Sequence, residues 1–185
     1  LTFDGAEVST LDSILDTLSS RGVKATFFLT KDQLKQGRSE VRDLILNGHS
    51  VGLLLQAPSP VSPKGCVNAA NNANDALQLI TKLRTRLLRV PESDWPALDT
   101  SCRNALVSAG YRLYAQSINT QNLTGLGSKA FAAQVESQIR LRSSNFVVVR
   151  LPLTMRGASR LPALLDTLRS NGYSFRVITE TTTPV

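Results

Sequence analysis

The sequence contains few of the residues that enzymes most often use for chemistry. Its 185 residues include one histidine, one tryptophan and two cysteines, and aromatic residues make up 5%. We expect no nucleophilic triad, because the one histidine, His49, stands at the start of a predicted strand with no second histidine to assist it. A partly buried histidine that hydrogen-bonds the backbone is the preferred interpretation. Apolar runs such as FVVVRLPL are far shorter than the roughly 20 residues of a membrane span.

The chain also has an excess of positive charge. It carries 21 Lys+Arg against 14 Asp+Glu, a formal net charge of +7, which favours anionic partners such as envelope polymers, lipid surfaces or nucleic acid. The basic residues are dense only at 82–89 and 140–142, and neither segment is interleaved with the aromatics of a base-stacking surface. We therefore expect no nucleic-acid partner, and a solvated basic face is the main alternative.

Length and composition predict one globular domain over residues 1–185, since no linker, repeat or low-complexity segment interrupts the pattern. The chain begins inside an expected strand and without methionine, which indicates a piece of a longer protein. Its targeting information is therefore not expected within these residues.

Apolar strand-like runs alternate with amphipathic helical patterns. The first helical pattern has Ser9 and Asp12 as a capping pair and ends at Gly22. Strands that are apolar on both faces predict a mainly parallel sheet, either an open doubly wound sheet or an incomplete barrel, with a site at the carboxyl ends of the strands. The expected strands are 1–3, 24–30, 50–55, 86–90, 111–118, 145–151 and 173–179. The expected helices are 9–22, 39–47, 67–83, 98–109, 129–141 and 158–172.

Six phrases carry a family resemblance: LTFDG, GVKATFFLT, LILNGHSVG, LLRVP, AGYRLY and SNGYSFRVIT. In this order and spacing they resemble the polysaccharide deacetylase (NodB homology) family, carbohydrate esterase family 4, over essentially the whole chain. The resemblance implies an α/β fold, a distorted incomplete (β/α)7 barrel with a mainly parallel sheet. It also implies removal of acetyl groups from chitin-like, xylan or peptidoglycan sugars.

The resemblance places the family's catalytic base at Asp4. It places the family's three metal ligands at Gly5, Leu54 and Pro58, whose side chains offer no electron pair to a divalent cation. We therefore expect no zinc or other divalent metal at this site and no cofactor. Metal-activated water would then be absent as well.

Other family motifs are altered too. Arg89 is retained, and the resemblance implies that it pairs with Asp4. A structural ion pair is the preferred interpretation of Asp4, with a working base and a ligand contact as alternatives. Arg150 replaces the catalytic histidine, and an arginine keeps its proton at neutral pH and is a poor general acid. Gln116, Ser117, Ile118 and Asn119 stand where the family has the W-D-x-D stretch that usually lines its pocket.

The segment LLRVPESDW brings Glu92, Asp94 and Trp95 close together. An acid beside an indole suits a sugar ring, whose apolar face stacks while its hydroxyls accept or donate hydrogen bonds. We predict that these residues, with Gln116 and Asn119, bind a ligand. A partly buried loop tryptophan is the alternative.

Cys66 and Cys102 precede or begin helices that flank one expected strand, so both are expected on the same side of the sheet. We predict a disulfide between them, which favours an exported protein of the extracellular space or cell envelope. Two unrelated thiols are the alternative.

Three functions follow from these observations. The first is a catalytically inactive deacetylase-like domain that binds a polysaccharide, a peptidoglycan-type glycan or other domains of the same envelope protein. The second is a metal-independent hydrolase that uses Asp4 with Glu92 or Asp94. The third is a structural or interaction module with an empty cleft.

Overall fold

A computed structural model describes residues 1–5, 8–58, 61–91, 93–96, 98–123 and 125–184. The chain divides into two compact units. One comprises Leu1–Thr26 and Gln116–Val177, and the other comprises Phe27–Ala115 and Ile178–Val185. The prediction of one family domain over residues 1–185 stays a prediction. Within the described ranges, no helix combines the length and the apolar character that crossing a membrane requires.

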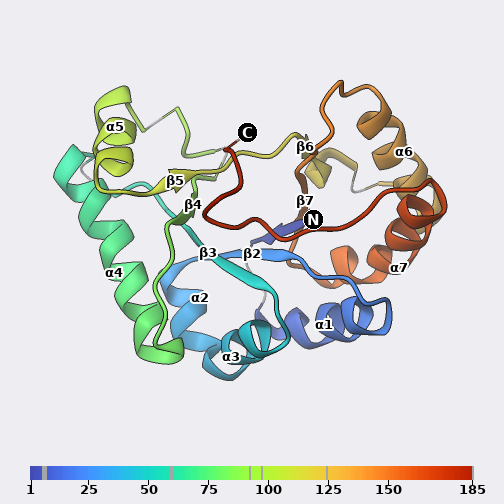
Figure 1. Ribbon diagram of the computed structural model, residues 1–185, viewed down its shortest axis with the longest axis horizontal. Coiled ribbons are helices and arrows are strands. Elements are labelled where there is room, and N and C mark those ends of the chain that lie inside the picture. The colour runs from blue at the N-terminus through green and yellow to red at the C-terminus, as the bar shows by residue number, and fades with distance from the viewer. Residues whose placement is uncertain (6–7, 59–60, 92, 97, 124, 185) are drawn as a thin grey trace. The chain divides into compact units, whose positions relative to one another are not determined.

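The first unit contains three parallel strands in the order β1-β7-β6. They are β1 (Thr2–Asp4), β7 (Val149–Pro152) and β6 (Ile118–Asn119). Its helices are α1 (Leu11–Ser20), α6 (Ser128–Arg140) and α7 (Met155–Ser170), with 3-10 turns at Val8–Thr10 and Thr120–Leu123. Helix α7 packs against both α6 and α1, and Figure 1 shows the three helices along one edge of this unit.

The second unit contains four strands in the order β5-β4-β3-β2, with the β3–β4 and β4–β5 pairs parallel. They are β2 (Thr26–Leu29), β3 (Ser50–Leu54), β4 (Leu87–Arg89) and β5 (Arg112–Leu113). Its helices are α2 (Lys31–Gln36), α3 (Arg38–Leu46), α4 (Pro63–Thr81) and α5 (Thr100–Ser108). Helices α4 and α5 lie side by side (Figure 1).

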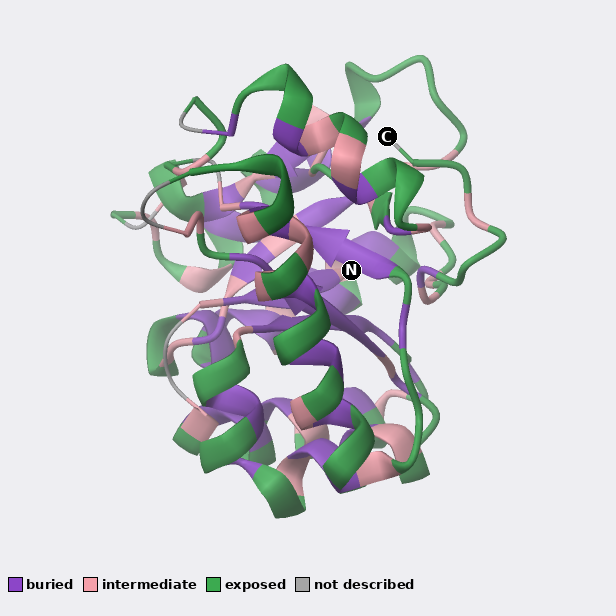
Figure 2. Ribbon diagram, turned by 90° about the vertical axis from the view of Figure 1, so that its left-hand side faces the viewer, coloured by how far each residue is buried: buried purple, intermediate pink, exposed green. Residues whose placement is uncertain are grey.

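Burial explains the parallel pairing. Every residue of β1, β2 and β4 is buried, as strands covered on both faces require. The helices are amphipathic: α1 buries Leu11, Ile14 and Leu18, which recur at the helical spacing. Figure 2 shows buried strands and helices with exposed outer faces. The predicted class, an α/β fold of the incomplete (β/α)7 NodB type, is confirmed.

Three predicted strands were wrong in their bounds or existence. The run 145–151 forms a strand only from Val149 onward, as β7. The run 111–118 forms two short strands, β5 and β6, rather than one. The run 173–179 forms no strand. Its end turns instead: the Thr182 amide bonds the Thr179 carbonyl, and the Tyr114 hydroxyl donates to the carbonyls of both residues. These hydrogen bonds satisfy the Thr179 and Thr182 carbonyls without a strand ladder.

All six predicted helices are present, but α4 begins four residues and α7 three residues earlier than predicted, and two further points were wrong. The predicted Ser9 cap of α1 was wrong, because the N-cap residue is Thr10 and it makes no side-chain capping bond. Helix α2 was not predicted. It is short, but a capping box between Thr30 and Gln33 fixes its start. His49 lies buried just before β3, edge-on to the ring of Phe27 at 5.5 Å, as expected for a packed histidine.

Candidate functional site

The site of the first unit begins at Asp4, the last residue of β1. Its carboxylate is buried, and a buried carboxylate requires charged or hydrogen-bonding partners to offset its desolvation. The next residue, Gly5, has a φ of +119°, a conformation that residues with a Cβ rarely adopt. The backbone that follows Asp4 is therefore shaped for glycine.

Arg150 is the partner of Asp4 within this unit. It lies on β7, where it pairs in register with Thr2, two residues before Asp4, so its side chain reaches Asp4 along the strand. Its Nε donates to Oδ1 of Asp4 in an ion pair whose side chains are 17% and 3% exposed. Arg150 thus neutralises Asp4, and the resemblance assigns these two positions to the family's catalytic histidine and catalytic base.

The rest of the Arg150 guanidinium is held by two amides. Its Nη1 donates to Oδ1 of Asn119 and to Oε1 of Gln121, both at 2.9 Å. Asn119 is the register partner of Arg150 on β6, and the Thr120 hydroxyl donates to the Arg150 carbonyl at 2.9 Å. These contacts fix the arginine on three sides.

The structure therefore brings three predicted residues together: Asp4, Arg150 and Asn119. Gln116 is half-buried two residues before β6. Gln121 belongs to the cluster but was missed by sequence reasoning. Its only signal was its position just after the strand end that carries Asn119, and the 3-10 turn that directs it back was not predicted.

Arg89, at the end of β4, lies in the second unit. It is buried, its Nε donates to the Tyr114 carbonyl and its Nη2 to the Ala115 carbonyl, both at 3.2 Å. Its guanidinium carbon lies 4.1 Å from the centroid of the Phe28 ring, a cation–π contact. The pairing of Arg89 with Asp4 stays a prediction.

The positions of the family's metal ligands do not fit a metal ion. Leu54 ends β3 as a buried hydrocarbon side chain, Pro58 is half-buried, and Gly5 has no side chain. Within the ranges that the structure describes, no three His, Cys, Asp or Glu side chains are grouped closely enough to hold an ion. The donor set at these positions cannot supply metal ligation.

Asp94 and Trp95 lie in the loop between β4 and α5. The Asp94 carboxylate accepts the Ala57 amide at 3.0 Å and the Ser93 hydroxyl at 2.8 Å, so it ties this loop to the loop after β3. The Trp95 side chain is 42% exposed, and the guanidinium carbon of Arg103 lies 5.1 Å from its ring centroid. Glu92 lies outside the described residues.

The predicted disulfide is present. Cys66 on α4 and Cys102 on α5 are bonded, with 6.0 Å between their Cα atoms, and both are buried. Asp99 caps α5 by accepting the Cys102 amide at 2.7 Å. This backbone hydrogen bond, and then that from the Ser101 hydroxyl, hold the pKa of Asp99 below its ordinary value of 3.8.

Comparison with known sequences and structures agrees with this description. Residues 1–114 match the family described as polysaccharide deacetylase. YheN of Bacillus subtilis, a provisionally assigned polysaccharide deacetylase, is 30% identical over 100% of this chain and 68% of its own length. A peptidoglycan-N-acetylglucosamine deacetylase of Bacillus cereus is 25% identical over 97% of this chain and 68% of its own.

Solved structures share the fold across the whole chain. A family 4 carbohydrate esterase from Streptomyces lividans, in complex with acetate, has a TM-score of 0.81 at 18% identity and covers 100% of this chain and 96% of its own. BA3943 of Bacillus anthracis, a pseudoenzyme of that esterase family, has a TM-score of 0.82 at 17% identity, covering 100% of this chain and 65% of its own. A mutant of BA3943 with restored enzymatic activity also has a TM-score of 0.82.

Proposed function

Because the chain belongs to the polysaccharide deacetylase family, we propose that it is a deacetylase-like domain that has lost hydrolysis and binds a cell-envelope glycan. The ion pair between Asp4 and Arg150 carries this proposal. A general base needs a carboxylate that is open to the attacking water, whereas this carboxylate is buried and bound to a permanent cation.

The chemistry of the ligand positions supports the same conclusion. A deacetylase of this family uses a metal ion to activate water and polarise the acetyl carbonyl. Glycine, leucine and proline at positions 5, 54 and 58 leave no side-chain donor for that ion. The missing metal ligands would prevent activation of water and of the acetyl carbonyl. The ion pair of Asp4 with Arg150 would prevent proton abstraction by the base.

A metal-independent hydrolase is the weaker candidate. It would require Asp4 or Asp94 as its acid or base. Asp4 is held by Arg150, and both oxygens of Asp94 accept hydrogen bonds that join two loops. Glycan binding makes no such demand, because amide and guanidinium groups that no longer serve catalysis can donate to sugar oxygens.

The relatives support the class of ligand and the location. One relative is by name a peptidoglycan deacetylase, and one structural neighbour is by description a pseudoenzyme. The disulfide between Cys66 and Cys102 is typical of an oxidising compartment. We therefore propose export to the extracellular space or cell envelope, with a peptidoglycan-type glycan as partner.

Glycan binding is tested by sedimentation of the full chain with insoluble chitin and with purified peptidoglycan. We expect co-sedimentation with at least one of the two, and weaker binding by the Asn119→Ala and Trp95→Ala variants. The Arg176→Gln variant, which removes an exposed charge of the first unit, is the matched control. Equal recovery of every variant, or no recovery of the wild-type chain, would contradict the proposal.

A further inference from the structure

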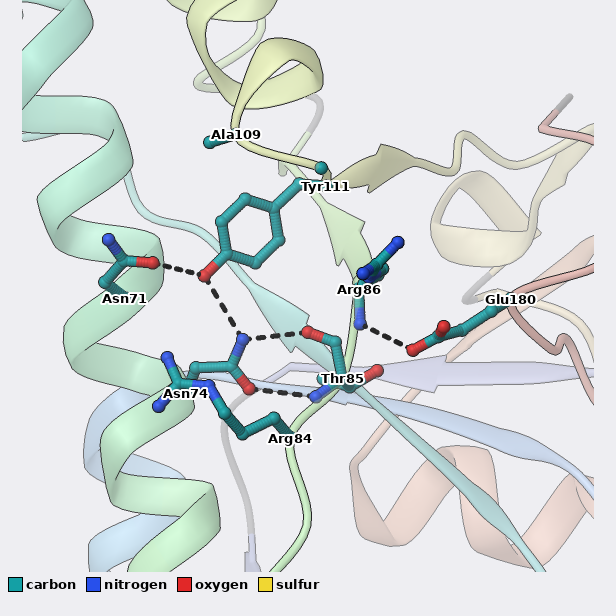
Figure 3. Close-up of a pocket in the computed structure, with 9 residues that line it drawn as sticks. Asn71, Asn74, Arg84, Thr85, Arg86, Ala109, Tyr111 and Glu180 are labelled. Atoms are coloured by element: carbon teal, nitrogen blue, oxygen red, sulfur yellow. Dashed lines mark hydrogen bonds between the residues drawn. The ribbon is translucent and has the colours of Figure 1, made fainter.

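A second polar pocket lies in the second unit, beside the start of β4, whereas Arg89 ends that strand. Its volume is about 360 Å³, within the range of roughly 300–1,000 Å³ typical of small-molecule sites. It is formed by α4, the turn before β4, the turn before β5 and the C-terminal segment, all in the second unit (Figure 3). The lining residues are Asn71, Asn74, Arg84, Thr85, Arg86, Ala109, Gly110, Tyr111 and Glu180.

One wall of the pocket is a fixed network of buried polar groups. Asn74 is 3% exposed, and its amide bridges the Thr85 backbone, donating to the carbonyl at 2.8 Å and accepting from the N–H at 2.9 Å. It also donates to the Tyr111 hydroxyl, which donates in turn to Oδ1 of Asn71 at 2.8 Å. This wall is satisfied internally and is therefore rigid.

The groups that face the pocket with unused capacity are mostly donors. Within the described parts of the chain, the guanidinium of Arg86 makes no hydrogen bond or ion pair, and the amide nitrogen of Asn71 has no acceptor. Arg84 is different, because Asp75 holds its Nη1 at 2.7 Å and raises its pKa. Arg86 is thus the pocket arginine whose guanidinium has no ion-pair partner among the described residues.

One acceptor completes the pocket. Glu180, in the C-terminal segment, accepts the backbone N–H of Arg86 at 3.2 Å through Oε1, and Figure 3 shows its side chain beside Arg86. Its other oxygen can accept from a hydroxyl of a ligand. The lining exposes more polar than apolar surface, because Ala109 and Gly110 are small and the Tyr111 side chain is buried. A hydroxyl-rich ligand with one anionic group matches this set.

We propose that this pocket binds the carboxylate or phosphate group of an acidic saccharide. Arg86 and the Asn71 amide donate to the anionic oxygens, and Glu180 accepts from a ring hydroxyl. The basic segment at 82–89 then has a specific use at Arg86 rather than serving only as a solvated face. The inference is independent of the proposed glycan site at Asp4, because it uses other residues, all of them in the second unit.

The test is a titration of the ¹⁵N-labelled full chain, followed by NMR, with glucuronate and with glucose 6-phosphate; glucose is the neutral control. We expect shifts of the Arg86, Asn71 and Tyr111 signals with either anion at millimolar concentration, and weaker binding as salt rises. The two anions distinguish a carboxylate from a phosphate ligand. No shift at these residues up to about 20 mM, or equal shifts with glucose, would overturn the proposal.

Two substitutions must act in opposite directions. Arg86→Gln should weaken anion binding about tenfold, because it removes a charge-assisted donor. Glu180→Gln should strengthen it about twofold or more, because it removes a negative charge and keeps the acceptor for the Arg86 amide. Arg38→Gln, an exposed arginine of the same unit outside the pocket, should bind as the wild type does. Equal affinities of all three variants for the anions would contradict the proposal. Arg150→Met should bind the anions as the wild type does, which would distinguish this pocket from the site at Asp4.

Discussion

Arg150 donates from Nε to the carboxylate of Asp4, and both side chains are largely removed from solvent. The resemblance assigns these two positions to the family's catalytic acid and base, so the proposed loss of both roles rests on one ion pair.

Removing Arg150 should destabilise the chain. Arg150→Met keeps the length of the side chain but deprives Asp4 of a charged donor, and we expect a loss of about 1.5–3 kcal/mol in the free energy of unfolding. Urea denaturation measures this change. Asp4→Asn in the Arg150→Met background should recover part of the loss, because the uncompensated charge is gone. An Arg150→Met variant as stable as the exposed control Arg176→Gln would contradict the assignment.

Gly52 on β3 should not tolerate a methyl group. A Cβ built there would lie 2.6 Å from Cε1 of Phe28, the ring that carries the Arg89 guanidinium. Gly52→Ala must displace that ring, and we expect a cost of about 1–3 kcal/mol, the usual cost of overpacking. Gly125→Ala is the control, because a Cβ there meets no atom within 4 Å. Equal melting temperatures of the two variants would show that Phe28 moves freely.

The disulfide should contribute substantially to stability. Cys66 and Cys102 close a loop with a sequence separation of 36, for which chain entropy predicts about 4 kcal/mol. The Cys66→Ala, Cys102→Ala double variant should unfold at a correspondingly lower urea concentration. Adding dithiothreitol should lower the midpoint of the wild type and leave that of the double variant unchanged. A shift in the double variant would point to a different effect of the reductant.

The cap of α5 should make stability depend on pH. The pKa of Asp99 is lowered in the folded chain, so its contribution is present above the unfolded value of 3.8 and is lost as pH falls through the folded pKa. Asp99→Asn keeps a capping oxygen but does not titrate. The stability difference between wild type and Asp99→Asn should therefore shrink below about pH 4. An NMR titration that placed the Asp99 pKa at or above 3.8 would contradict this.

The sequence predicted well those features that depend on burial patterns and motif spacing. The alternation of buried strands with amphipathic helices identified the parallel fold, and the shared helix-end position of Cys66 and Cys102 identified the disulfide. The 173–179 run looked like a strand from its apolar content, but hydrogen bonds from Tyr114 to the backbone beyond it favour a turn.

The site was harder to predict because its contacts depend on side-chain reach. Motif order placed Asp4, Arg89 and Arg150 at strand ends, but it paired Asp4 only with Arg89. The pairing with Arg150 depends on the β1–β7 register. This register sets Arg150 opposite Thr2, two residues before Asp4, so the arginine side chain reaches Asp4 along the strand. The spacing of residues in the sequence predicts neither the β1–β7 register nor the contact of Gln121 with Arg150.

We propose that the chain does not hydrolyse acetylated glycans, and a measurement of acetate release decides whether it does. The purified full chain, supplied with zinc, is incubated with acetylated chitooligosaccharides and peptidoglycan beside the Bacillus cereus peptidoglycan deacetylase as the active reference. We predict acetate from the reference and none above the protein-free rate from this chain. Acetate released at an enzymatic rate, and abolished by Asp4→Asn, would contradict the proposal that this chain has lost hydrolysis.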